Sequence, residues 1–386
     1  MSKVEKRLLA VLTIIAFSFS LFLAWFYLTR WKLPLGPALQ QTYSTPFGMP
    51  PTWTPNFDAT NTPHSTPEPV PVSSASFTPE AAPTQTGLCG RDEPMFILVI
   101  GSDTRAENYL YGLADVIRLV RLDFATPKAV VLEIPRDLWV EIPDIADNLN
   151  GQDHEKLNQA YLYGNPGFGY TNDPAGGPGL LSRTLTLNFG TRIDHYAAVN
   201  MRTFTKIVDA VDGIDVTLPK TVDGRTPDDM NKRLLFLQGS HHLNGTQALT
   251  LARIRINGTF SRADNQDRVL CALREKLTRP DVVANIPSLI QSFQGAVQTS
   301  LSPEELGQIA CLSTQVEPQD AVFTGFPQQL FEQDRTYDPV FKKSVFTWKV
   351  DYEILRDYIQ QFNEGTWPSA VHVIQDSQER ETHLCQ

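Results

Sequence analysis

Two short apolar runs joined by a polar segment most constrain what this chain can fold into. Residues 95–100 form an apolar run with the length of a buried strand, and the run ends in Gly-Ser-Asp-Thr-Arg at 101–105. A second apolar-rich run begins at Asp115. We therefore expect Asp103 and Asp115 to lie at the ends of two neighbouring strands. Such a pair suits a hard cation, Mg²⁺ or alternatively Mn²⁺, because both ions prefer carboxylate oxygen.

Strands and helices alternate after this point, and their order predicts an α/β fold. The architecture we expect is a three-layer α-β-α sandwich with a central mixed sheet. The expected strands are 116–123, 129–134, 138–142, 193–200 and 213–218, and the expected helices are 155–163, 178–189, 201–211, 243–251 and 263–277. Residues 252–256 are expected to be extended, 280–313 helical, 321–326 an edge strand and 351–362 a last helix.

The N-terminal region contains an apolar run without a charged residue, at 8–29. At about 1.5 Å per residue, a helix of this length spans roughly 30 Å of hydrocarbon. We expect a single-pass signal-anchor with residues 1–7 as a cytoplasmic tail, so that the remaining chain lies outside the cell membrane. A cleaved signal peptide is the alternative, but no clear A-x-A cleavage site follows the run.

The segment at 30–88 is crowded with Pro, Thr and Ser, which predicts a disordered linker that holds the domain away from the membrane. The extracytoplasmic domain is expected at 89–365, with a core at 95–279 and a C-terminal helical extension. Residues 366–386 are expected to form a C-terminal tail.

The four cysteines show no C-x-x-C spacing, so a zinc site is not expected. An even number of cysteines suits disulfides in an exported domain. One of the three possible connectivities joins Cys271 to Cys311 and Cys89 to Cys385, and this is the pairing that we expect.

Arginines gather in the second half of the domain core. Arg253 and Arg255 alternate, so on an extended segment both side chains point to one face. Arg262 and Gln266 share one helix face, and Arg136 follows a predicted strand. Arginine suits phosphate because its planar guanidinium donates two parallel hydrogen bonds and stays charged. A cation between two aspartates, surrounded by arginines, is the arrangement that stabilises a pyrophosphate.

Several other readings are weaker. Each arginine alone is more often half of a surface ion pair, and the aspartates alone could be turn residues. His241 and His242 are adjacent, so they do not point together, and we expect a solvated turn there. Asp194 and His195 begin an apolar strand, for which we expect a structural role. The formal net charge of −10 argues against general nucleic-acid binding, and the common nucleotide, zincin and serine-hydrolase motifs are absent.

A set of short motifs follows in a fixed order along the domain core. They are Ile-Gly-Ser-Asp-Thr-Arg (100–105), Ala-Asp-Val-Ile (114–117), Ile-Pro-Arg-Asp (134–137), Lys-Leu-Asn-Gln-Ala-Tyr (156–161), Gly-Gly-Pro (176–178), Ile-Asp-His-Tyr (193–196), Val-Asp-Ala-Val-Asp-Gly-Ile-Asp-Val (208–216), His-Leu-Asn-Gly-Thr-Gln-Ala-Leu (242–249) and Arg-Ile-Arg (253–255). In this order they resemble the LytR-CpsA-Psr family of cell-envelope phosphotransferases. The expected anchor and external domain resemble the layout of that family too.

The resemblance implies an enzyme that binds a polyisoprenyl-pyrophosphate-linked glycopolymer, with the lipid in a hydrophobic tunnel. With Mg²⁺, it would transfer the glycopolymer-phosphate to a hydroxyl of peptidoglycan or another envelope acceptor. The tunnel is expected among 201–211, 180–189 and the helix of Cys271. By position, the implied metal ligands are Asp103 and Asp115, and the implied catalytic residues are these two with Arg136, Arg253 and Arg255. The candidate substrate-binding residues are Arg105, Arg118, Lys156, Asn158, Arg262 and Gln266.

Three positions depart from the family pattern. Leu113 and Asn265 stand where the family usually or often has arginine, and Thr259 stands where it usually has an acid. Our hypothesis is that Arg118 or Arg105 replaces the missing charge and that Asp264 replaces the missing acid. These departures leave two alternatives open, a carrier-binding protein with weakened transferase activity and a pyrophosphatase. A transcriptional attenuator is opposed, because only about seven residues precede the anchor.

Overall fold

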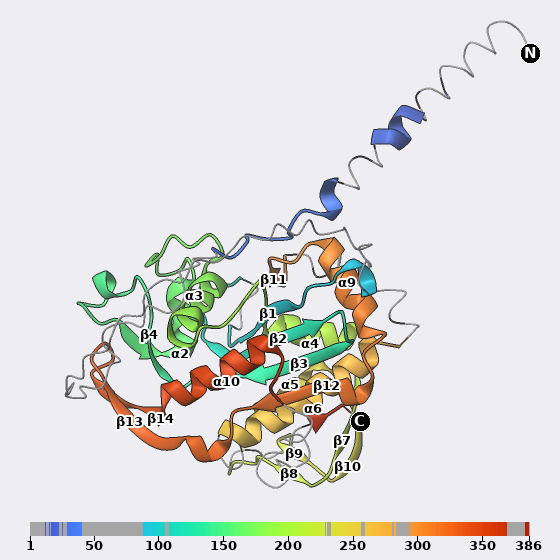
Figure 1. Cartoon of the computed structure of the whole chain (residues 1–386). Coiled ribbons are helices and arrows are strands. Elements are labelled where there is room, and N and C mark those ends of the chain that lie inside the picture. Colours follow the sequence, from blue (N-terminus) through green and yellow to red (C-terminus); the bar gives the residue numbers. More distant parts are fainter. Residues whose placement is uncertain are drawn as a thin grey trace, which may run out of the picture.

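A seven-stranded sheet forms the centre of the computed structural model (Figure 1). The structure describes residues 29–40, 88–104, 108–227, 233–255, 259–279, 295–368 and 383–385, together with 12, 15, 17–22, 25, 229, 282 and 293. The anchor expected at 8–29 therefore lies mostly outside the described residues. Within the part that is described, no helix has the length and apolar character needed to cross a membrane.

The sheet contains parallel and antiparallel neighbours, in the order β11-β6-β1-β2-β3-β12-β15. Strand β1 pairs in parallel with β6 and antiparallel with β2, and β3 pairs antiparallel with β2 and in parallel with β12. The predicted α/β fold with a central mixed sheet is thus confirmed. The strands are β1 (Met95–Ser102), β2 (Ala114–Asp123), β3 (Lys128–Glu133), β6 (His195–Asn200), β11 (Gln298–Thr299), β12 (Ala321–Gly325) and β15 (His383–Leu384).

Helices cover both faces of the sheet, because successive side chains of each strand point to opposite faces. From β1, Phe96 and Leu98 enter a core that contains residues of α2 (Leu157–Gly164), α3 (Gly177–Phe189) and α10 (Tyr352–Glu364). Met95 and Ile97 instead join Leu301 and side chains of α9 (Pro303–Ser313). The other face also carries α4 (Met201–Ala210), α5 (Gly245–Arg253) and α6 (Thr259–Leu277).

Side-chain caps fix where α4 and α5 begin. The Asn200 side chain accepts a hydrogen bond from the backbone N–H of Thr203 at 2.8 Å, directly after β6. Asn244 and Gln247 form a capping box at the start of α5, which satisfies backbone donors that the helix leaves free. A third core joins these helices to β7 (Ile214–Leu218) and β10 (Gly239–Leu243), which pair antiparallel. The two helices thereby present fixed faces to the sheet.

Several local predictions are wrong. The segment 298–299, predicted to be helical, forms β11 because it pairs with β6. Strand β12 is not at the sheet edge, since β15 from the expected C-terminal tail pairs beyond it. His241 and His242 lie in β10 rather than in a turn. A hairpin of β13 (Glu332–Asp338) and β14 (Lys343–Lys349) was not predicted.

The smaller strands are β4 (Trp139–Glu141), β5 (His154–Lys156), β8 (Val222–Asp223) and β9 (Leu235–Phe236).

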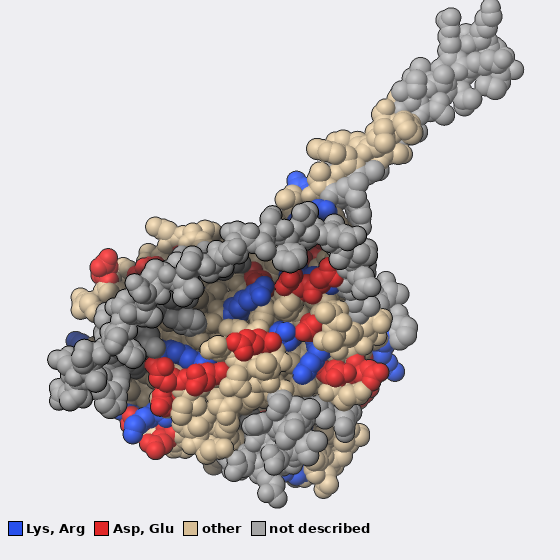
Figure 2. Space-filling view, in the orientation of Figure 1, with Lys and Arg blue, Asp and Glu red and all other residues tan. Residues whose placement is uncertain are grey.

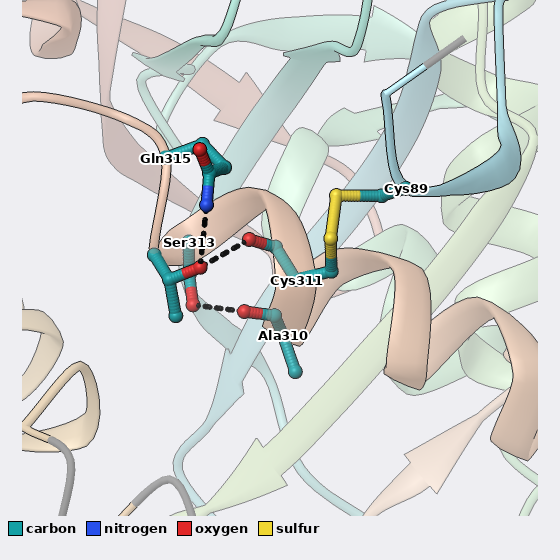
Figure 3. Close-up of a disulfide and its surroundings, with 6 residues drawn as sticks. Cys89, Ala310, Cys311, Ser313 and Gln315 are labelled. Atoms are coloured by element: carbon teal, nitrogen blue, oxygen red, sulfur yellow. Dashed lines mark hydrogen bonds between the residues drawn. A yellow bond between two sulfur atoms is a disulfide. The ribbon is translucent and has the colours of Figure 1, made fainter.

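The expected disulfide pairing is also wrong. The bonds are Cys89–Cys311, with Cα atoms 5.8 Å apart, and Cys271–Cys385, with Cα atoms 5.2 Å apart. Figure 3 shows Cys311 on its helix, α9, joined to the segment that precedes β1. Because β15 places the C-terminal segment beside α6, Cys385 reaches Cys271 instead of Cys89. The two bonds therefore fasten both ends of the domain to helices on one face of the sheet.

The chain between 33 and 40 packs on the domain, although this stretch was expected to be linker. The backbone N–H of Leu35 donates to the carbonyl of Leu301 at 3.0 Å. Gly36 lies so close to β11 that an added Cβ would be 2.6 Å from the carbonyl oxygen of Thr299. Leu39 packs against the main core. This segment is thus docked beside β11.

Candidate functional site

A cavity of about 680 Å³ lies between the sheet and helices α4, α5 and α6. Most of its wall is apolar, with Phe204 and Ile207 from α4 and Val269 and Leu273 from α6. The predicted contributions of 201–211 and of the Cys271 helix are thus observed. The contribution predicted for 180–189 is not, because α3 packs on the opposite face of the sheet. The polar residues in the wall include Asp115, Arg118, Arg253, Arg255, Arg262 and Gln266.

Asp103 is held at the end of β1 by the segment that leads into β2. Its backbone N–H donates to the carbonyl of Leu113 at 3.1 Å, and its carboxylate accepts from the N–H of Leu113 at 2.7 Å. The pairing register shifts between Gly101 and Ser102, directly before Asp103. Such an irregularity re-aims a side chain at a strand end. The main chain of Leu113 thus orients one of the two predicted carboxylates.

Asp115 lies in β2 and touches two of the predicted arginines. Its carboxylate forms an ion pair with the guanidinium of Arg136, and its carbonyl accepts from Nη2 of Arg262 at 3.3 Å. Arg136 enters from the segment after β3, and Arg262 from the first turns of α6. Three residues that are distant in sequence therefore meet at the polar end of the cavity.

The donor set at this end suits one hard cation. Asp103 and Asp115 supply carboxylate oxygens, the type of ligand that Mg²⁺ prefers. Among the residues that the structure describes, no cluster of three or more His, Cys, Asp or Glu side chains could hold a metal ion. A cation here would therefore share its coordination with water and with oxygens of a bound phosphate, as Mg²⁺ commonly does.

Positive charges are concentrated beside these carboxylates. Burial, followed by the nearby charges of Arg136 and Arg255, lowers the pKa of Arg262 to about 10. Burial also lowers the pKa of Arg136, and Arg255 adds to the shift while Asp137 opposes it. The guanidinium groups of Arg136, Arg255 and Arg262 therefore lie close enough to repel one another. An anion bound among them would relieve that repulsion, so the cluster favours a phosphate or pyrophosphate.

The end of α5 presents two exposed arginines at the cavity. The helix runs through Arg253, so Ala252 and Arg253 are helical rather than extended as predicted. Ile254 is extended and buried, with φ −64° and ψ 133°. Arg253 and Arg255 flank it, are exposed, and line the cavity. The buried isoleucine therefore holds the two arginines at the entrance.

Arg118 is buried in the cavity wall and balanced by an acid. Its Nη1 lies 2.6 Å from Oδ1 of Asp267, and its Nη2 donates to Oε1 of Gln266 at 3.3 Å. Gln266 in turn donates from Nε2 to the carbonyl of Ala252 at 3.3 Å. This network links β2 and α6 to the last turn of α5, directly before Arg253. Arg118 thus adds less net charge to the site than the sequence suggested, and it fixes Gln266.

Two further candidates brace the Arg136 segment instead of lining the cavity. Lys156 donates from Nζ to Asp137 at 3.1 Å, and the backbone N–H of Asn158 donates to the carbonyl of Arg136 at 3.1 Å. Arg105 and the side chain of Thr259 lie outside the described residues. Two acids at the site, Asp137 and Asp267, were not predicted. Their only signal was adjacency to Arg136 and Gln266.

Figure 2 shows Asp and Glu intermingled with Lys and Arg across one face of the molecule. That face carries no continuous basic patch among the residues described. An apolar cavity that ends in arginines and two carboxylates defines a site for an amphiphilic phosphate or pyrophosphate ligand.

The chain belongs to the LytR_cpsA_psr family, whose model matches residues 60–342. It is 28% identical to "Regulatory protein MsrR" of Staphylococcus aureus over 219 residues, which are 56% of this chain and 59% of the relative. It is 29% identical over 214 residues to Bacillus subtilis TagV, named as a polyisoprenyl-teichoic acid–peptidoglycan teichoic acid transferase. The match covers 55% of this chain and 51% of TagV, so the chain spans little more than half of these curated relatives.

Solved structures share the fold. The crystal structure of B. subtilis TagV superposes with a TM-score of 0.54 at 23% identity, covering 71% of this chain and 98% of that one. A structure described as "TagT bound to LI-WTA" gives a TM-score of 0.51 at 20% identity, covering 72% of this chain and 91% of that chain. These two likenesses concern the arrangement of the sheet and its helices.

Proposed function

We propose that this protein is a phosphotransferase that moves a glycopolymer-phosphate from a polyisoprenyl-pyrophosphate carrier to a hydroxyl of peptidoglycan. The observation that carries the proposal is the apolar cavity that ends at Asp115, Arg253, Arg255 and Arg262. The isoprenoid chain would occupy the cavity, where its transfer from water is favourable. The pyrophosphate would lie among the arginines. Family membership and the name of the relative TagV support this assignment.

In the proposed reaction, the acceptor oxygen bonds to the phosphorus next to the glycopolymer. The bond from that phosphorus to the bridging oxygen breaks, so the leaving group is polyisoprenyl phosphate, and the proton of the acceptor hydroxyl passes to that leaving phosphate or to solvent water. Arg136, Arg255 and Arg262 would neutralise the charge that develops on the phosphoryl oxygens. A bound Mg²⁺, or Mn²⁺, held by Asp103 and Asp115 would supply Lewis-acid stabilisation of the same charge.

We place the protein in the cell membrane through one helix at 8–29, with its N-terminus in the cytoplasm and its domain outside. The uncharged apolar run at that position supports this placement. Polyisoprenyl carriers lie in the membrane, so an attached domain would have its substrate at high local concentration. Peptidoglycan, or another envelope polymer, would then be within reach of the external face.

A second candidate is a polyisoprenyl-pyrophosphate-binding protein or pyrophosphatase with weakened transfer. Two observations favour it. Leu113 contributes only its main chain to Asp103, and the charge of Arg118 is balanced by Asp267. The arginine expected at 113 is therefore not replaced by a free charge at Arg118. Water attacking the same phosphorus would release the polymer phosphate without a glycan acceptor.

The test replaces Arg253 and Arg255 by alanine and measures binding of a polyisoprenyl pyrophosphate to the full chain in detergent. We expect binding to fall more than tenfold, because charge-assisted hydrogen bonds to phosphate are lost. The matched control replaces Arg279 and Arg335, which are exposed and lie outside the cavity, and should retain binding. Unchanged binding in the first double variant refutes the site. Formation of polyisoprenyl phosphate with and without peptidoglycan then separates transfer, which needs the acceptor, from hydrolysis, which does not.

A further inference from the structure

An exposed group of aromatic rings lies on the α2 side of the carboxylates, and neither the catalytic proposal nor the cavity uses it. We name it the aromatic ledge, and it consists of Tyr111, Tyr163, Phe168 and Tyr170. The ring centroids of Tyr111 and Phe168 are 5.5 Å apart, those of Phe168 and Tyr170 are 5.2 Å apart, and those of Tyr163 and Tyr170 are 5.6 Å apart. Tyr111 is 54% exposed and Phe168 is 41% exposed, whereas Tyr163 is buried beneath them.

The aromatic ledge is a built surface. Oη of Tyr111 donates to the carbonyl of Gly167 at 3.0 Å, and the N–H of Gly167 donates to the carbonyl of Leu110 at 3.1 Å. A Cβ at Gly167 would lie 2.3 Å from that carbonyl oxygen, so only glycine permits the contact. The two loops are therefore fixed against each other while their rings stay exposed. Exposed apolar groups held in this way mark a binding surface.

Short main-chain connections tie the aromatic ledge to the reaction centre. The carbonyl of Tyr111 accepts a hydrogen bond from the hydroxyl of Thr104, the residue after Asp103. Two residues after Tyr111, the N–H of Leu113 donates to the carboxylate of Asp103. The rings lie beside α2, whereas the cavity lies under α4, α5 and α6 on the other face of the sheet. The segment that carries Tyr111 is therefore joined by hydrogen bonds to Asp103 and to the residue after it.

We infer that the aromatic ledge binds the glycan strand of the acceptor and brings its hydroxyl to the reacting phosphorus. Pyranose rings have apolar C–H faces and polar edges, so they stack on aromatic rings while their hydroxyl groups remain in water. This inference rests on the proposed function. In a displacement at phosphorus, the attacking and leaving oxygens lie roughly in line. If the lipid phosphate leaves toward the cavity, the acceptor must approach from outside it, and the aromatic ledge is an exposed surface joined to Asp103 by hydrogen bonds through Leu113 and Thr104.

The test titrates the full chain in detergent with a four-sugar glycan fragment of peptidoglycan and follows binding by NMR. Replacing both Tyr111 and Phe168 by alanine should raise the Kd about tenfold, as expected for the loss of two aromatic anchors. The matched control replaces Tyr337 and Phe341, exposed aromatic residues of the β13–β14 hairpin region, and should bind like the parent. Thermal unfolding checks that each variant is folded.

A second arm separates this inference from the proposed function. Binding of polyisoprenyl pyrophosphate, with and without attached polymer, is measured for the same variants. Unchanged donor binding with weakened glycan binding supports the acceptor assignment. Glycan binding that is undetectable in the parent, or equal in the parent and the double alanine variant, overturns it. A loss of binding that affects only the polymer-bearing donor also overturns the acceptor assignment. Failure of the parent to bind any donor refutes the proposed function, while the glycan titration still decides the role of the aromatic ledge.

Discussion

Two fully buried carboxyl groups, Glu155 of β5 and Asp338 at the end of β13, face each other in the domain. Burial, and then the charge and hydrogen bond of Asp338, raise the pKa of Glu155 to about 8. One oxygen of Asp338 accepts from the N–H groups of Val340 and Phe341, both at 2.9 Å. Glu155 is the member of the pair whose pKa is raised, so Glu155 carries a proton below about pH 8. The pair lies where the β13–β14 hairpin meets the segment that leads into α2.

The sign of the pH effect follows from that shift. The pKa of Glu155 is higher in the folded state than in the unfolded chain, where it is about 4.5. Its contribution to stability is therefore complete below about pH 4.5 and is lost as pH rises through about 8. Between pH 6 and pH 8, the free energy of unfolding should fall by about 2 kcal/mol from this group alone. Glutamine cannot ionise, so Glu155→Gln should remove that part of the pH dependence.

The assay is urea unfolding of the disulfide-intact protein at pH 6, 7 and 8, for the parent and for Glu155→Gln. The measure is the difference between the two pH slopes, because other groups titrate equally in both proteins. The control is Glu332→Gln, at an exposed position of β13, the strand that ends at Asp338. This variant should keep the pH slope of the parent. Equal pH slopes for the parent and Glu155→Gln would refute the raised pKa of Glu155.

Two other consequences concern buried contacts. Asp267→Ala removes the acid that lies 2.6 Å from Arg118, and the loss of a buried ion-pair partner should lower the free energy of unfolding by about 3 kcal/mol in urea titrations. A change below about 1 kcal/mol would show that the pair is as weak as an exposed one. Gly36→Val should displace the docked segment, because a Cβ there meets the β11 carbonyl at 2.6 Å. Chymotryptic cleavage within 33–40 should then be faster, and an unchanged rate would contradict docking.

The sequence located most of the sheet because buried strands leave a strong pattern. Residues 95–100 are apolar and residues 116–123 are rich in Val, Ile and Leu, and the structure places them in β1 and β2. The β13–β14 hairpin was missed because most of its side chains are exposed and polar, so apolar alternation is weak. The cysteine pairing depended on β15, a two-residue strand that local sequence does not predict. Local sequence patterns do not predict the pairing of short strands that are distant in sequence.

The candidate site was predictable for residues that end strands or helices. Asp103 and Asp115 follow from neighbouring strands, and Arg255 follows from its alternation with Arg253. The role of Arg118 was not predictable, because its partner Asp267 lies on a helix far along the chain. The same limit applies to the aromatic ledge, whose rings come from two loops and from α2. Charge near a motif is visible in sequence, but its neutralisation and the packing of loops require the fold.

The docked segment changes how the Pro-rich stretch relates to the domain. Leu35 is bonded to Leu301 directly before α9, and Cys89 is bonded to Cys311 on α9. The described residues on both sides of 41–87 are therefore fixed to the domain, 33–40 by Leu35 and Leu39 and the other side by Cys89. Residues 41–87 therefore do not set the distance between the domain and residue 33. The entropic cost of closing a loop between two fixed ends grows only slowly with the length of the loop. If residues 8–29 cross the membrane as proposed, the connection to the domain is the few residues before Leu35. A domain held that closely would keep its apolar cavity near the bilayer from which a polyisoprenyl carrier must enter.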